Sequence, residues 1–135
     1  MKGKDFYMEG FRDKHKFNFF VVGADGFLGS SLVSHLKNQG YHVVGSTRRK
    51  DTISSCRVFL DVKDSINFKI SNNITCVFIV AGISDYGLCE TDPDAWNINV
   101  KAIPNLVSRF LKAGAFVNFI STNLVFGGNQ PWPKE

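Results

Sequence analysis

The chain has 135 residues, of which 44% are hydrophobic and 21% are charged, a composition typical of a globular domain. No apolar run approaches the roughly 20 residues of a membrane-spanning helix, and the first residues lack the apolar core of a secretory signal, so we expect a cytoplasmic protein. The formal net charge is +4, but no basic stripe with interleaved aromatic residues accompanies it, which argues against nucleic-acid binding. Residues 1–16 are expected to be a basic, flexible tail before a single domain over 17–135.

The first predicted element is a buried strand over residues 17–23, where aromatic and β-branched residues run up to a glycine. Apolar residues at helical spacing follow from Leu28, and Gly40 supplies the stop of this helix. Two further strands are predicted over residues 41–47 and 56–62.

The second half of the chain begins with the strongest predicted strand, over residues 74–82. Asp92 is predicted as the N-cap of a helix, because a proline follows it, and Gly114 ends that helix. Pro104 lies inside the helical pattern and predicts a kink or a broken turn, and residues 115–121 read as a fifth strand. The apolar face of the helix is predicted to comprise Trp96, Val100, Ile103, Val107 and Phe110.

Strands that alternate with helices favour an α/β fold with a parallel sheet covered on both faces. We expect a Rossmann-like doubly wound sheet with strand order 3-2-1-4-5, truncated after the fifth strand. The exposed edge of such a sheet predicts self-association. The three cysteines are expected to be buried reduced thiols, and neither they nor the histidines show the spacing of metal ligands, so we predict no metal.

Three glycines stand at the junction between the first strand and the first helix, at Gly23, Gly26 and Gly29. The first permits a tight turn, the second lets the backbone approach a pyrophosphate, and the third allows the helix to pack closely on the strand. The helix N-terminus would then present N–H groups to the phosphates. An ordinary strand–turn–helix junction is the alternative, but this context favours nucleotide binding.

The end of the second strand indicates which dinucleotide is bound. An acid usually stands there, about 20 residues after the glycines, when the 2′-hydroxyl of NAD is recognised. Here the place holds Arg48 and Arg49, whose guanidinium groups can pair with the 2′-phosphate of NADP, although Asp51 could pair with either. We therefore predict NADP as the cofactor, with NAD as the alternative; a solvated basic loop would be the non-functional explanation.

Five spaced motifs together resemble the extended short-chain dehydrogenases/reductases, the superfamily of NAD-dependent epimerases and dehydratases, and most closely the dTDP-4-dehydrorhamnose reductase branch. These are GADGFLGSSL, LDV, VAG, NINV and FISTNLVFGG, spread from the first strand to the C-terminal residues. The resemblance implies oxidoreductase, epimerase or dehydratase chemistry on a nucleotide-linked sugar. It places the cofactor on Gly23, Gly26, Phe27, Leu28, Gly29, Arg48, Arg49, Asp61, Val62, Ala81, Gly82, Asn99 and Ser121.

The same resemblance assigns a catalytic hydroxyl to Thr122, which would hold a substrate carbonyl beside a tyrosine; the alternative is that this residue merely ends a strand. In the family a lysine four residues after the tyrosine lowers its pKa for proton transfer. No Y-x-x-x-K occurs in this chain. We therefore expect an incomplete domain, without a substrate lobe, that does not catalyse alone.

Three hypotheses remain open at this point. The chain is the cofactor-binding part of an oxidoreductase, or a non-catalytic NADP-binding regulatory or scaffold protein, or an interaction protein with a vestigial fold that binds no cofactor. Its expected partners are a dinucleotide and, for a complete enzyme, a nucleotide-linked sugar, with neither nucleic acid nor membrane.

Overall fold

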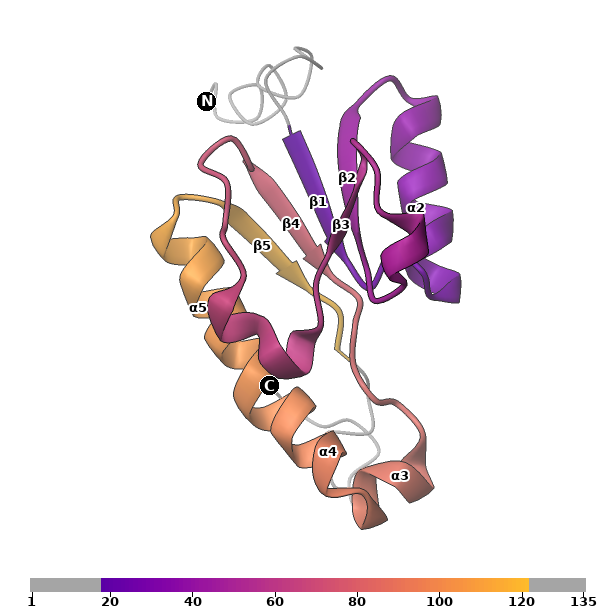
Figure 1. The fold of residues 1–135 in the computed structure, drawn as a ribbon, viewed down its shortest axis with the longest axis vertical. Helices are drawn as coiled ribbons and strands as arrows, with labels where there is room; N and C mark the ends of the chain where they lie inside the picture. The colour runs from indigo at the N-terminus through magenta and orange to yellow at the C-terminus, as the bar shows by residue number, and fades with distance from the viewer. Residues whose placement is uncertain (1–17, 122–135) are drawn as a thin grey trace, which may run out of the picture.

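A five-stranded parallel sheet forms the centre of the molecule. The computed structural model describes residues 18–121, and the expected N-terminal tail lies outside them. The strands run in the spatial order β3-β2-β1-β4-β5 (Figure 1), which confirms the predicted order. Their bounds are β1 (Asn18–Val22), β2 (His42–Thr47), β3 (Arg57–Phe59), β4 (Cys76–Ile79) and β5 (Phe116–Phe119).

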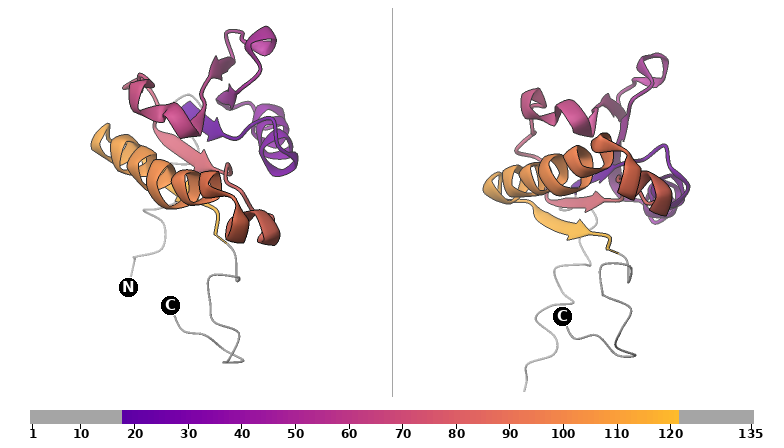
Figure 2. Two further views of the ribbon diagram at one scale, coloured as in Figure 1. Left: turned by 60° about the horizontal axis from the view of Figure 1, so that its bottom comes forward. Right: turned by 90° about the horizontal axis from the view of Figure 1, so that it is seen from below.

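The central strand β1 divides the core into two layers, because successive side chains of a strand point to opposite faces. Phe19 and Val21 pack on the side of helix α2 (Phe27–Asn38). Phe20 and Val22 pack on the opposite side, against helix α5 (Ile103–Lys112). Both faces of the sheet are therefore covered, as a parallel sheet requires, with the two helices on either side of it in Figures 1 and 2.

The helical segment before β5 buries a different face from the one predicted. It comprises α4 (Pro93–Trp96), a π-helical segment η5 (Asn97–Ala102) and α5. The Asp92 carboxylate accepts a hydrogen bond from the Asp94 N–H at 2.9 Å, so the predicted N-cap is confirmed. The π turn stands immediately before Pro104, where a broken turn was expected. The π turn is wider than an α turn, so it rotates the residues before it relative to the buried face of α5. Trp96 and Val100 are therefore exposed, and Leu106 is buried instead.

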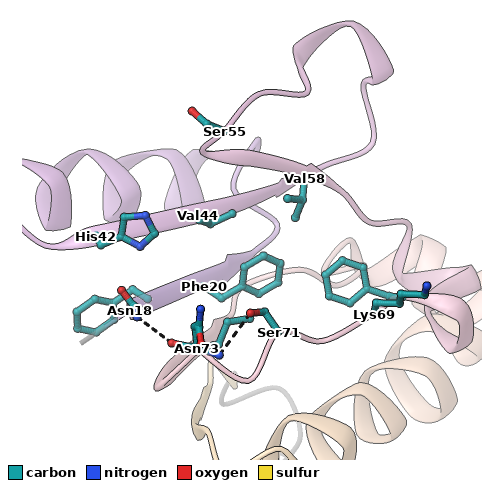
Figure 3. Close-up of a pocket in the computed structure, with 12 residues that line it drawn as sticks. Asn18, Phe20, His42, Val44, Ser55, Val58, Lys69, Ser71 and Asn73 are labelled. Atoms are coloured by element: carbon teal, nitrogen blue, oxygen red, sulfur yellow. Dashed lines mark hydrogen bonds between the residues drawn. The ribbon is translucent and has the colours of Figure 1, made fainter. Parts of the chain in front are cut away.

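The crossover from β3 to β4 contains no α-helix. It forms the 3-10 segment η4 (Val62–Asn67) and an extended stretch, which the Arg109 guanidinium of α5 holds by donating to the carbonyls of Ser65 and Phe68. Beside it lies a hollow of about 460 Å³ at the amino ends of β1 and β2. Figure 3 shows Phe20 and Val58 on its apolar wall, with His42 and Lys69 near opposite ends.

The remaining predictions concern the burial of the cysteines, the edge of the sheet and membrane-spanning helices. Cys76 is buried and Cys56 half-buried, but the expectation of a buried thiol is wrong for Cys89, because helix α3 (Tyr86–Thr91) buries none of its residues. Phe116 and Phe119 of the edge strand β5 are exposed. Within residues 18–121 no helix is long and apolar enough to cross a bilayer.

Candidate dinucleotide-binding site

The turn after β1 has the conformation that only glycine adopts easily. Gly23 has a φ of +90°, and a Cβ at this position would lie 2.8 Å from the Ala81 amide nitrogen, which follows β4. The Gly26 N–H donates to the Gly23 carbonyl at 3.1 Å and closes the turn. A side chain at Gly23 would therefore be excluded both by backbone strain and by the neighbouring chain.

The other two glycines differ in how closely the neighbouring backbone approaches them. A Cβ at Gly29 would overlap the Gly23 carbonyl oxygen and lie 2.9 Å from the Ala24 Cα, so α2 can approach the turn only without a side chain there. At Gly26 the one neighbour within 4 Å would be the Gly23 oxygen, at 3.4 Å. Gly26 also caps α2 without a side-chain hydrogen bond, so the helix N-terminus stays accessible to an anion.

Two side chains at the end of β2 hold the glycine turn against the sheet by hydrogen bonds. The Ser46 hydroxyl accepts a hydrogen bond from the Gly23 N–H at 2.8 Å. The neighbouring Thr47 hydroxyl donates to the Asp25 carboxylate at 2.6 Å. Both β2 side chains are buried, so the turn is held from inside the protein while its outer side remains free.

Asp25 is the acid of the glycine turn, and two arginines surround its carboxylate. Arg57 of β3 contacts Oδ1 through Nη1, and the Arg49 Nη2 lies 3.5 Å from the same oxygen. Burial raises the pKa of Asp25, but the Thr47 hydrogen bond and the charges of Arg57 and Arg49 together lower it below its ordinary value. The carboxylate is therefore ionised at neutral pH and committed to these partners.

The two arginines predicted to read the cofactor lie in different surroundings. Arg48 lines the cleft beside the glycine turn. Arg49 is engaged by Asp25. Within residues 18–121 it forms no ion pair with Asp51, the partner considered from sequence. The acid that pairs with Arg49 therefore comes from the glycine turn and not from the loop after β2.

A cleft of about 290 Å³ opens where the strands end. It is bounded by the glycine turn, by the end of β2, by the segment after β3 and by the segment after β4. The first segment contributes Gly23, Asp25 and Gly26, the second Ser46, Thr47 and Arg48, the third Leu60, Asp61 and Val62, and the fourth Val80, Ala81, Gly82 and Ile83, with Ile98 of η5 added. Ligands of open α/β sheets bind at this edge.

Asp61 and Asn99 are supported by local hydrogen bonds. The Asp61 carboxylate accepts from the Lys63 N–H at 3.0 Å, which caps η4 and keeps Asp61 on the cleft. The Asn99 amide binds the backbone of Ile83 at both ends, accepting from its N–H at 3.0 Å and donating to its carbonyl at 2.8 Å. Asn99 therefore shapes the segment after β4, and its neighbour Ile98 forms the cleft wall.

Some predicted residues do not bring a side chain to the cleft. Phe27 is 92% exposed and Leu28 is half-exposed, and neither lines the cleft, so their backbone N–H groups are what they offer there. Ser121 is exposed and also absent from the lining. Thr122, the predicted catalytic hydroxyl, lies outside the described residues.

The sequence reading missed four polar residues of the site. Asp25 and Arg57 are separated by 32 positions, and Ser46 and Thr47 look like ordinary strand residues. The one available signal was the acid inside the glycine motif, where a carboxylate beside a phosphate site needs a compensating cation.

These features define a dinucleotide-binding fold of the Rossmann type, with a glycine turn, an accessible helix N-terminus and a cleft at the carboxyl edge of the sheet. A bare backbone at Gly26 and compensated charge at Asp25 fit a pyrophosphate group. The sequence profile of the NAD dependent epimerase/dehydratase family matches residues 19–135, and the chain belongs to this family. The resemblance drawn from the motifs is thereby confirmed.

Individual relatives cover much of the chain. Methionine adenosyltransferase 2 subunit beta of Rattus norvegicus is 29% identical over 118 residues, which are 85% of this chain and 35% of that protein. The structure of MoeE5 in complex with UDP-glucose and NAD matches with a TM-score of 0.68 and 31% identity, over 82% of this chain and 38% of that one. A hypothetical dTDP-4-dehydrorhamnose reductase from Sulfolobus tokodaii, at 24% identity, shares the fold with a TM-score of 0.70, over 88% of this chain and 44% of that one. The chain thus spans about a third of the length of the curated relatives it matches.

Proposed function

We propose that this chain binds NADP in the cleft at the carboxyl edge of its sheet. The observation that carries the proposal is the glycine turn, in which Gly23 and Gly29 are required for packing whereas Gly26 is not. A glycine that the fold does not need, facing the cleft at a helix N-terminus, is explained by a ligand that must approach the backbone.

The preference for NADP over NAD rests on Arg48. This side chain lines the cleft at the end of β2, where a guanidinium forms charge-assisted hydrogen bonds with a 2′-phosphate. Such a bond contributes about 1.5–3 kcal/mol before solvent losses, so one retained bond corresponds to a preference of about tenfold or more. Residues 45–50, at the end of β2, contain no acid of their own.

Titration calorimetry with both cofactors tests this proposal. The wild type should bind NADP about tenfold more tightly than NAD, and Arg48→Ala should weaken NADP alone. Gly26→Val should abolish binding of both cofactors, because its side chain would enter the cleft, while circular dichroism shows that the fold is retained. Unchanged affinity in Gly26→Val would contradict the cleft, and equal affinity for both cofactors in wild type and Arg48→Ala would contradict the NADP assignment.

The wider activity that we propose is reduction, epimerisation or dehydration of a nucleotide-linked sugar by a protein of which this chain is the cofactor-binding part. Membership of the epimerase/dehydratase family supports this class of reaction. The bound dinucleotide would donate or accept hydride, and Thr122 would orient the substrate carbonyl. Because a threonine hydroxyl is too weak an acid to supply the proton near neutral pH, and no Y-x-x-x-K occurs, the chain alone should not reduce a keto-sugar nucleotide. Cofactor oxidation in such an assay would refute this expectation.

A second candidate is a non-catalytic subunit that binds the dinucleotide for regulation or as a scaffold. The rat relative, which is named as a subunit of methionine adenosyltransferase, favours it. The coding sequence distinguishes the two candidates. A reading frame that continues into Y-x-x-x-K and a substrate lobe supports the enzyme, and a stop codon after Glu135 supports the subunit.

A further inference from the structure

A compact charge cluster joins the glycine turn to the end of β2 and to β3. Its members are Asp25, Arg49 and Arg57, with the Thr47 hydroxyl as a third contact to the carboxylate at 2.6 Å. The register that pairs Gly45 of β2 with Arg57 of β3 brings the second arginine to this place. One carboxylate faces two guanidinium groups, so the cluster retains one net positive charge.

The two arginines are held to different degrees. The Arg49 side chain is 64% exposed, with a single long contact of 3.5 Å to the carboxylate, so it can turn toward another anion at small cost. Arg57 is 25% exposed and in direct contact with the same oxygen. Any anion that recruits Arg49 therefore competes with Asp25 for that guanidinium and approaches the carboxylate closely.

Arg48, next in sequence to Arg49, lines the cleft itself. A phosphate that binds at this edge lies within the field of the cluster, since charges this close are only weakly screened by salt. A neutral hydroxyl at the same place carries no charge and is nearly indifferent to that field. The cluster is therefore positioned to distinguish a phosphorylated from an unphosphorylated ribose.

We propose that Asp25 and Arg57 are specificity-determining residues, in which the Asp25 carboxylate withholds Arg49 and Arg57 from the 2′-phosphate and so limits the preference for NADP over NAD. This inference rests on the proposed binding of a dinucleotide. It adds two residues, one from the glycine turn and one from β3, to the arginines at the end of β2.

The test measures dissociation constants of NADP and NAD for charge-neutralising variants. Asp25→Asn keeps the shape and can still accept from Thr47, so the preference for NADP over NAD, measured as the ratio of the two dissociation constants, should rise about tenfold. Asp51→Asn serves as the matched control, because it removes one carboxylate charge from the neighbouring loop, and among residues 18–121 the ion pair of Arg49 is with Asp25. Its ratio of the two constants should stay near that of the wild type.

Neutralising Arg57 should change the preference for NADP over NAD in the opposite direction in the same assay. Arg57→Gln should lower the preference for NADP over NAD about threefold or more, and Arg57→Lys, which keeps the charge, should restore most of that preference. A purely structural role for the cluster predicts equal losses for both cofactors, and that result, or an unchanged ratio in Asp25→Asn, would overturn the inference. If the wild type binds neither cofactor, the proposed function itself fails.

Discussion

Replacing Gly29 by alanine should destabilise the protein, although alanine in a helix normally stabilises by about 0.5–1 kcal/mol relative to glycine. The reason is the close approach of α2 to the turn after β1. A Cβ at Gly29 would lie 2.8 Å from the Gly23 carbonyl carbon and 2.9 Å from the Ala24 Cα, and these are backbone atoms that no side-chain rotation can clear. Helix and turn must therefore separate.

The expected cost follows from the size of that displacement. Overpacking of a tight interface by one methyl group costs about 1–3 kcal/mol and occasionally more, and contact with backbone places Gly29→Ala at the upper end. For a domain of about 100 residues, 1 kcal/mol corresponds to roughly 4 °C in melting temperature, so we expect a decrease of about 10 °C.

The matched control is Gly26→Ala, three residues earlier in the same motif. Its φ of −74° suits any residue, and its Cβ would have one neighbour at an ordinary contact distance of 3.4 Å. Its melting temperature should stay within about 3 °C of the wild type. Thermal unfolding followed by circular dichroism, with urea titration as a second measurement, compares the three proteins. A Gly29→Ala protein that melts at or above the wild-type temperature would refute the reasoning.

The remaining predictions concern surface and titration. Asp25 has a lowered pKa in the folded protein, so the stability it contributes is present above about pH 4 and is lost as the pH falls through the folded pKa. Between pH 6 and about pH 3, the urea midpoint should therefore fall further for the wild type than for Asp25→Asn. Parallel curves for the two proteins would contradict this. The Ser54 hydrogen bond, followed by that of Lys37, lowers the pKa of half-buried Cys56, whereas burial raises the pKa of Cys76. Iodoacetamide should accordingly alkylate Cys56 at least about tenfold faster, as peptide mass spectrometry can measure, and equal rates would count against it. Phe116, 68% exposed on the edge strand, should promote self-association in sedimentation velocity that Phe116→Lys reduces; a monomeric wild type at high concentration is the contrary result.

Local patterns in the sequence were enough to predict the sheet and the roles of the glycines. The alternating pattern and the glycine motif favour a Rossmann-like fold, whose expected strand order 3-2-1-4-5 agrees with the structure. Gly23 and Gly29 are recognisable because turn geometry and helix–strand distance act within a few residues. The N-cap at Asp92 is local in the same sense.

Only the tertiary structure decided which charges meet and which faces are buried. Asp25 and Arg57 are 32 positions apart, and the pairing of β2 with β3 brings them together. Trp96 is exposed because the π turn that follows it, unmarked by hydrophobic spacing, takes it out of phase with the buried face of α5. Periodicity determines the local conformation of a chain, but a side chain's partner depends on strand register and helix phase, and both are settled only when the core packs.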